Sequence, residues 1–191
     1  MEYILASKSP RRKELFSLLV PQFACETAEV DERAVTITDP EVLCLELAKL
    51  KCRAVAKAHP DCCVIGSDTM VAVDGKLLGK PADREDELRM LRMLSGSTHE
   101  VHTGICLHLP DGREMCGVDT ATVHMMPLTE ENIRRYIATG EPMDKAGAYA
   151  IQGRAGIFIS HIEGSPSSVI GLPLGLLTRF FDEAGIDYFE T

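Results

Sequence analysis

The chain has 191 residues, of which 45% are hydrophobic and 26% are charged, a composition typical of a folded globular protein and not of a disordered one. Its formal net charge of −9 excludes a broad electrostatic surface for nucleic acid, but it leaves room for a local basic pocket. Because no apolar run approaches the roughly 20 residues of a membrane-spanning helix, and no secretory signal is visible, we expect one cytoplasmic domain, residues 1–191, without membrane or nucleic-acid partners.

Helix and strand patterns alternate along the chain. Pro10 and Pro40 each follow a residue that can cap a helix. Apolar periodicity and turn residues predict, in chain order, strand 3–6, helices that begin at 10 and 40, strand 62–65, hairpin 71–78, helix 83–94, strands 101–109 and 121–125, helix 129–139, strands 149–151 and 157–162, and helix 174–184. The turns at Asp74-Gly75 and Pro110-Asp111-Gly112 favour antiparallel pairs, so the expected fold is α/β with a mixed sheet.

The cysteines and the common catalytic motifs exclude several classes. Seven cysteines make an odd number, and no Cys-x-x-Cys occurs, so neither a disulfide framework nor a zinc site is expected. Reduced thiols inside apolar segments act as small hydrophobic residues, as in a reducing cytosol. The chain also lacks a phosphate-binding P-loop, a dinucleotide-binding glycine motif and the nucleophile elbow of serine hydrolases.

A basic cluster follows the first predicted strand. Ser7, Ser9, Arg11 and Arg12 lie at a strand-to-helix junction, where free backbone N–H groups favour an anion. Arginine presents fork-shaped donors that match phosphate oxygens. The residues favour phosphate binding; the alternative is a solvated first helical turn that carries two arginines.

Carboxylates and lysines form the next candidates. Asp31-Glu32 lies in a polar segment, and Asp68 belongs to Gly66-Ser67-Asp68-Thr69, where we expect strand 62–65 to end. Carboxylates from separate loops suit Mg²⁺, which shares its oxygen ligands with phosphates. The alternatives are surface charge for Asp31-Glu32 and a turn or cap for Asp68. Lys51 and Lys80 are candidates for phosphate binding, or they cover apolar surface with their stems.

The most unusual segment runs from Glu141 to Gly153. It combines acids, a lysine, small residues and an amide between a predicted helix and a predicted strand. The Gln152 carboxamide has donors and acceptors that suit the edge of a nucleotide base. Alone, this segment predicts only a structured loop.

In this order, the clusters resemble the Maf family of nucleoside triphosphate pyrophosphatases over nearly the whole chain. The segments that carry the resemblance are Ser7 to Arg12, Asp31-Glu32, Lys51, Gly66 to Thr69, Gly79 to Pro81, Ser95-Gly96, His99 to Gly104, Glu141 to Gly153, Gly164-Ser165 and Val169 to Pro173. The resemblance implies a mixed sheet with flanking helices and two lobes around a central cleft, as in Maf and inosine triphosphate pyrophosphatase proteins. It also implies cleavage of a nucleoside triphosphate to the monophosphate and pyrophosphate.

The resemblance further assigns roles to single residues. Asp68 corresponds to the proton acceptor, whereas Arg11, Thr69 and Gln152 occupy the positions of substrate choice. The residues expected to bind phosphate are Ser7, Ser9, Arg11, Arg12, Lys51, Lys80 and Lys145. Glu32 and Asp68 are the expected ligands of a divalent metal, Mg²⁺ first, with Mn²⁺ or Co²⁺ as alternatives. The pattern Glu-Pro-x-Asp-Lys-Ala-Gly-x-Tyr-x-Ile-Gln-Gly is similar to the subgroup that acts on dTTP and UTP.

Two other functions stay open at this point. One is a non-enzymatic regulator of septum formation that binds division proteins, a role also linked with the family. The other is the same hydrolysis of a modified or purine nucleotide. A homodimer agrees with the family and with the common preference of soluble proteins for two-fold assembly.

Overall fold

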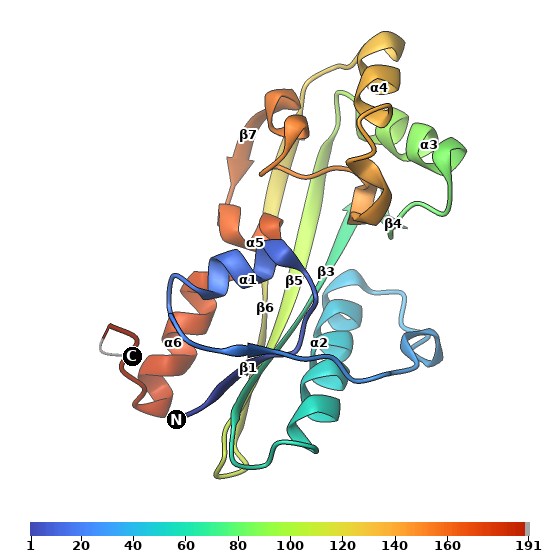
Figure 1. The fold of residues 1–191 in the computed structure, drawn as a ribbon. Helices are drawn as coiled ribbons and strands as arrows, with labels where there is room; N and C mark the ends of the chain where they lie inside the picture. Colours follow the sequence, from blue (N-terminus) through green and yellow to red (C-terminus); the bar gives the residue numbers. More distant parts are fainter. Residues whose placement is uncertain (190–191) are drawn as a thin grey trace.

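A mixed seven-stranded sheet runs the length of the molecule in the computed structural model, which describes residues 1–189 (Figure 1). Its strand order is β2-β1-β3-β5-β6-β7, with β4 paired to β3 beside this path. The strands are β1 (Tyr3–Leu5), β2 (Ala24–Cys25), β3 (Cys63–Val73), β4 (Lys76–Leu78), β5 (Thr98–His108), β6 (Glu114–Met125) and β7 (Ile159–Glu163). β1 pairs in parallel with β2 and β3, and the other pairs are antiparallel, which confirms the mixed sheet that the hairpin turns predict.

The helices flank this sheet, and all but the short α5, which was not predicted, lie where the sequence patterns predict them. They are α1 (Pro10–Phe16), α2 (Pro40–Ala56), α3 (Arg84–Leu94), α4 (Glu130–Ile137), α5 (Pro166–Ile170) and α6 (Leu174–Ala184). Asp39 caps α2 by accepting from the Val42 N–H at 2.9 Å, and Asp83 caps α3 by accepting from the Asp86 N–H at 2.9 Å. None of the helices among the described residues is both long and apolar enough to cross a membrane.

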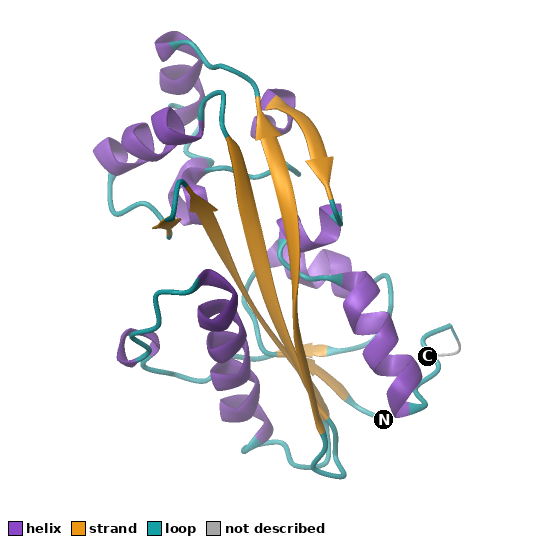
Figure 2. Ribbon diagram, turned by 180° about the vertical axis from the view of Figure 1, so that it is seen from behind, coloured by secondary structure: helices purple, strands orange, loops and turns teal. Residues whose placement is uncertain are grey.

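The long strands β3, β5 and β6 run between α1 and α6 in one half of the molecule and α3 and α4 in the other (Figures 1 and 2). Each half has its own hydrophobic core. Ile65 and Ile105 belong to the core under α1 and α6, whereas Val71 and Val101, further along the same strands, belong to the core under α3 and α4. Side chains that alternate with the first set, Cys106 among them, face α2 on the opposite side of the sheet. Residues 66–70 of β3 therefore lie at the waist between the cores.

Two glycines let α2 pack unusually close to the sheet. A Cβ atom at Gly66 would lie 2.4 Å from the Ala48 carbonyl oxygen, and one at Gly104 would lie 2.5 Å from the Cys44 carbonyl oxygen. Any larger residue would push the helix away. The close approach places Lys51, on the next turn of α2, over the middle of β3.

The predicted strand at 149–151 is wrong. The short 3-10 helices η2 (Pro142–Asp144), η3 (Ala146–Ala148) and η4 (Arg154–Phe158) surround this segment, and β7 begins only at Ile159. Tyr149 and Ala150 are both buried, Tyr149 in the core under α3 and α4, and the Tyr149 hydroxyl hydrogen-bonds His99 Nε2 at 2.8 Å. Burial against a core, not strand pairing, explains the apolar pattern here.

Candidate functional site

A cavity of about 530 Å³ opens at the waist of the molecule, where one edge of β3 lacks a paired strand. β1 pairs with β3 only as far as Ile65, and β4 pairs with it only from Val71, so residues 66–70 lie between two partners. All the site residues predicted from sequence line this cavity, although the chain brings them from distant segments. They are Ser7, Ser9, Arg11, Arg12, Glu32, Lys51, Asp68, Thr69, Lys80, Lys145 and Gln152.

Asp68 lies in the middle of a strand and not at its end. β3 continues through Gly66 to Val73 because β5 pairs with it along this whole stretch, with Asp68 opposite Gly104. The prediction that the strand ends at Gly66 is therefore wrong. Its physical cause is the partner strand, which the local sequence does not reveal. The result is an aspartate whose side chain is only 11% exposed, held by rigid backbone at the cavity wall.

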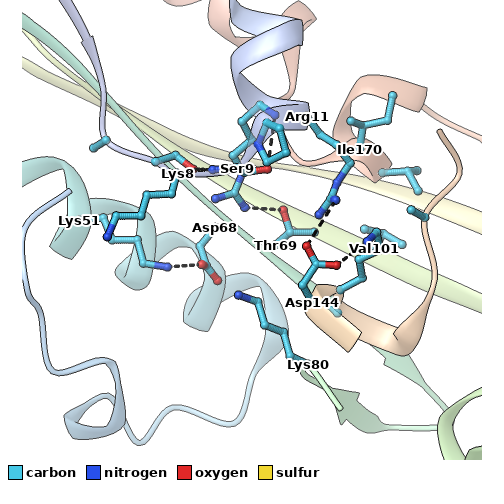
Figure 3. A pocket seen from close by; sticks show the side chains of 18 of the residues that line it. Lys8, Ser9, Arg11, Lys51, Asp68, Thr69, Lys80, Val101, Asp144 and Ile170 are labelled. Carbon is cyan, nitrogen blue, oxygen red and sulfur yellow. Dashed lines mark hydrogen bonds and ion pairs between the residues drawn. The ribbon is translucent and has the colours of Figure 1, made fainter. Parts of the chain in front are cut away.

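One ammonium group joins the two predicted metal ligands. Lys51 Nζ lies 2.5 Å from Asp68 Oδ1 and 3.0 Å from Glu32 Oε1 (Figure 3 shows the first of these ion pairs). Glu32 begins the 3-10 helix η1 (Glu32–Ala34), and Asp31 caps that helix through the Arg33 N–H. Asp31 thus helps to orient Glu32. Two carboxylates that converge on one cation form a donor set that a divalent metal can also use.

Arg12 holds neighbouring segments of the chain together at the wall of the cavity. Its side chain is half-buried and donates to the Gly171 carbonyl at 2.8 Å, the Ser67 carbonyl at 2.8 Å and Thr69 Oγ1 at 3.1 Å. Burial lowers the pKa of this guanidinium, and the nearby Asp68 carboxylate opposes that effect. Three of its N–H donors thus tie α1 to β3 and to the loop after α5, so phosphate binding by Arg12 stays a prediction.

Arg11, Lys80 and Lys145 line another part of the cavity. The Arg11 side chain is 26% exposed and lies 4.0 Å from Asp144 Oδ2, a long contact that leaves the guanidinium available to a ligand. Lys145 pairs with Asp144 and donates to the Glu141 carbonyl at 2.7 Å. Lys80 is exposed and extends into the cavity from the chain after β4 (Figure 3).

The charge of the cavity is opposite to that of the whole chain. Its lining includes six basic side chains and three acidic ones: Lys8, Arg11, Arg12, Lys51, Lys80 and Lys145 against Glu32, Asp68 and Asp144. The chain as a whole carries −9. A local positive field of this kind attracts and holds a polyanion of the size of a nucleotide phosphate chain.

The two serines of the basic cluster shape the turn into α1. Ser9 caps the helix by accepting from the Arg12 N–H at 3.5 Å, and Ser7 Oγ accepts from the Ser9 N–H at 3.2 Å. Thr69 also has local partners, because its hydroxyl hydrogen-bonds Thr103 Oγ1 at 3.0 Å. These contacts preorganise the rim of the cavity, and direct ligand contacts by the three hydroxyls stay predictions.

Glu141 is an organising residue whose role the sequence did not disclose. Its carboxylate accepts hydrogen bonds from the Tyr136 hydroxyl at 2.8 Å and the Arg154 N–H at 3.0 Å, on either side of the loop that carries Gln152. Burial alone would raise the pKa of Glu141, but these hydrogen bonds lower it overall. A Cβ at Gly153 would lie 2.3 Å from Glu141 Oε1, so the acid and the glycine occur together for a steric reason. The presence of Glu141 and Gly153 at the two ends of one motif was the sequence signal that could have disclosed this role.

Comparisons with known proteins agree with this geometry. The family model described as Maf-like protein matches residues 2–184. A protein from Geobacillus sp. (strain WCH70) is 47% identical over 178 residues, which cover 93% of this chain and 95% of the relative. A protein from Symbiobacterium thermophilum is 45% identical over 188 residues, which cover 98% of this chain and 96% of the relative. Both relatives are named dTTP/UTP pyrophosphatase.

A solved structure supports the fold. The Staphylococcus aureus Ham1 protein superposes with a TM-score of 0.57 at 17% sequence identity, over 96% of this chain and 100% of that one. At this identity the likeness concerns the fold alone. It agrees with the mixed α/β architecture expected from the sequence.

Proposed function

The chain belongs to the Maf family, and on that premise we propose that it hydrolyses dTTP and UTP to the nucleoside monophosphate and pyrophosphate. Relatives about equally long, and 45% to 47% identical, bear the name of this activity. The observation that carries the proposal is that one cavity holds six basic side chains beside a Glu32–Lys51–Asp68 ion-pair network. Polyphosphate binding and acid–base chemistry thus meet at one place.

The ion-pair network fits a divalent metal, for which we propose Mg²⁺. Glu32 and Asp68 already share one cation, Lys51 Nζ, at 3.0 Å and 2.5 Å. Mg²⁺ prefers oxygen ligands, usually keeps several waters, and is commonly bound by one or two carboxylates together with substrate phosphates. When bound, it would neutralise phosphate charge and lower the pKa of coordinated water. Glu32 and Asp68 would hold it.

The residues of the chain divide the work of hydrolysis. Arg11 and Lys80 bind phosphate oxygens and offset the charge that repels an incoming nucleophile. Asp68 accepts a proton from the water whose oxygen forms a new bond to the α-phosphorus. The bond between the α-phosphorus and the bridging oxygen breaks, and pyrophosphate leaves with that oxygen. Lys51 keeps the Asp68 carboxylate in position before the substrate arrives.

The loop that carries Gln152 recognises the base of the nucleotide. The Gln152 side chain is exposed at the cavity wall, where its carboxamide pairs with the polar edge of a pyrimidine. Glu141 fixes the loop from behind. Arg11 and Thr69, which also line the cavity, complete the positions of substrate choice. A dimer and a cytoplasmic location stay predictions from the sequence.

A nucleotide panel tests the proposal. UTP, dTTP, CTP, ATP and ITP are compared at equal concentration with Mg²⁺ and with chelator, and pyrophosphate and orthophosphate are measured separately. We expect pyrophosphate release from UTP and dTTP that requires the metal. Asp68→Asn should lose at least about 100-fold in kcat, because proton transfer contributes roughly 10² to 10⁴. Asp74→Asn, on the exposed β3–β4 turn, is the matched control and should keep full activity.

The panel also separates the alternatives. Preferred turnover of ITP or ATP would move the activity to purine nucleotides. A chain that hydrolyses none of the nucleotides, yet captures division proteins, would support the binding role instead. Gln152→Ala should reduce the ratio of UTP to ATP turnover and leave the metal requirement unchanged; an equal loss on all nucleotides would contradict base reading by Gln152.

A further inference from the structure

Four side chains with metal-binding atoms gather on one face of the β5–β6 hairpin. Cys106 lies opposite Cys116, and His108 lies opposite Glu114, in the antiparallel register of the two strands. Because side chains alternate along a strand, residues two apart share a face, so the four form two neighbouring cross-strand pairs. We call Cys106, His108, Glu114 and Cys116 the hairpin cluster.

The donor atoms of the hairpin cluster are close together. The two Sγ atoms and a carboxylate oxygen of Glu114 lie within 4.8 Å of one another, and Cys116 Sγ donates to Cys106 Sγ at 3.2 Å. His108 Nδ1 lies 3.5 Å from Glu114 Oε1. This nitrogen is buried and has no hydrogen-bond partner within the part of the chain that the structure describes. A buried polar atom without a partner calls for an explanation.

We propose that the hairpin cluster binds a thiophilic divalent cation of the Zn²⁺ type. Thiolate, imidazole and carboxylate are the ligands that Zn²⁺ uses, normally four in tetrahedral geometry. Bond lengths of about 2.0 to 2.3 Å in that geometry set neighbouring donor atoms about 3.3 to 3.8 Å apart. The two Sγ atoms are 3.2 Å apart, and the carboxylate oxygen of Glu114 lies within 4.8 Å of both. His108 Nδ1, 3.5 Å from Glu114 Oε1, is the proposed fourth ligand.

The charges around the hairpin cluster balance with such an ion. Binding of the metal displaces one proton from each thiol to solvent, so two thiolates and the Glu114 carboxylate offset the two charges of the metal and leave one negative charge over. Arg53 compensates it, since Arg53 Nη2 already lies 2.7 Å from Glu114 Oε2. A carboxylate has lone pairs for both the guanidinium and a metal.

Packing of a small residue explains only in part why cysteines occupy positions 106 and 116. Cys106 is fully buried under α2 and packs there as a small apolar residue. That role requires neither a second thiol directly opposite on β6 nor a histidine and a glutamate as the next pair. Cys116 and Glu114 are partly exposed, which provides an entry path for an ion.

The hairpin cluster is separate from the proposed active site. None of its four members is among the residues that line the cavity. The ion would therefore join two strands of the sheet and stabilise the folded state, without a part in hydrolysis. This inference does not rest on the proposed enzymatic function.

Cadmium provides a direct probe, since its thiolate complexes absorb in the ultraviolet. The full chain is reduced, freed of metals and titrated with Cd²⁺ in excess Mg²⁺, which occupies carboxylate sites elsewhere. We expect a charge-transfer band that saturates at one Cd²⁺ per chain. At a hundredfold excess over the dissociation constant, Cd²⁺ should raise the melting temperature by about 5 to 10 °C.

Variants assign the band to the hairpin cluster. Cys116→Ser should weaken Cd²⁺ binding at least about 100-fold, because even changes outside the ligand set cost about 10- to 100-fold. His108→Gln should weaken Cd²⁺ binding at least about tenfold, while the thiolate band still forms at high Cd²⁺. This variant tests the hairpin cluster even if Cys116→Ser folds poorly. Cys25→Ser, at the exposed thiol of β2, is the matched control and should leave the titration unchanged.

Three outcomes would overturn the proposal. They are a wild-type chain without a saturable thiolate band at one equivalent, a Cys116→Ser variant that retains the band at wild-type affinity, and a His108→Gln variant with unchanged affinity. Hydrolysis in Mg²⁺ should be the same for wild type and both variants.

Discussion

Replacement of Lys51 by methionine tests the ion-pair network at the waist. Met keeps most of the volume of the lysine stem but removes the ammonium that lies 2.5 Å from Asp68 Oδ1 and 3.0 Å from Glu32 Oε1. Two carboxylates then face each other without a cation. Asp68 has little water to screen it, since its side chain is 11% exposed, whereas that of Glu32 is 50% exposed.

The expected loss of stability follows from these exposures. A hydrogen bond to a charged group contributes about 1.5 to 3 kcal/mol, and the half-exposed Glu32 adds less than 1 kcal/mol. We therefore expect Lys51→Met to lower the free energy of unfolding by about 2 to 3 kcal/mol without metal. In a protein of this size about 1 kcal/mol corresponds to 2 to 4 °C, so the melting temperature should fall by about 4 to 12 °C.

Mg²⁺ should reverse much of this loss. The ion replaces the missing ammonium between the carboxylates, so the gap in melting temperature between wild type and Lys51→Met should at least halve in saturating Mg²⁺. Lys49→Met is the matched control, because the Lys49 side chain is about as exposed as that of Lys51 but pairs with the more exposed Glu46 along the same helix, and a pair near the surface contributes roughly 0.2 to 1 kcal/mol. A Lys51→Met gap that is equal in chelator and in Mg²⁺ would refute a shared site for lysine and metal.

Three further perturbations follow from the structure. Gly104→Ala places a Cβ 2.5 Å from a carbonyl of α2, so it should destabilise the fold by about 1 to 3 kcal/mol or more and reduce activity, as thermal unfolding and turnover will show. Glu141→Gln loses the charged acceptor that fixes the loop of Gln152, so the KM for UTP should rise roughly tenfold, about 1.4 kcal/mol, with a smaller change in kcat. Burial lowers the pKa of His99 to about 4, with a smaller contribution from His124, so the unfolded chain binds the extra proton first. The contribution of His99 to the free energy of unfolding is fully present above pH 6.5 and should fall by about 3 kcal/mol as the pH drops towards 4. Denaturant unfolding of His99→Gln should lack this pH dependence.

Each of these three has a defined contrary outcome. Gly175→Ala, where no atom lies within 4 Å of the new Cβ, is the control for the glycine variant, and an equal loss from both would contradict the close-approach argument. For Glu141→Gln, unchanged KM values on all nucleotides would remove the positioning role. For His99→Gln, a pH dependence identical to that of wild type would show that the imidazole is accessible to protons in the fold.

The local elements of this protein were predictable because they depend on local chemistry. Helix α3 begins after a capping aspartate, α6 ends at Gly185 with φ +74, and the β3–β4 hairpin turns at Asp74-Gly75, each as composition indicates. The site residues were also recognisable, because side chains that bind phosphate or a metal must be of a few chemical types in a recurring order. The family resemblance predicted that these residues meet in one cavity. Their spacing along the sequence did not.

Tertiary contacts decided the rest. β3 runs through Asp68 because β5 pairs with it over nine residues of register, and Arg12 ties α1 to β3 because carbonyl groups from two other segments reach it. The hairpin cluster escaped a search for Cys-x-x-Cys, because its thiols face each other across two strands and are ten residues apart in the chain. Sequence order reports which groups are present and how each short segment tends to fold. Which groups meet depends on strand register and on the approach of α2 to the sheet, and these are properties of the folded chain as a whole.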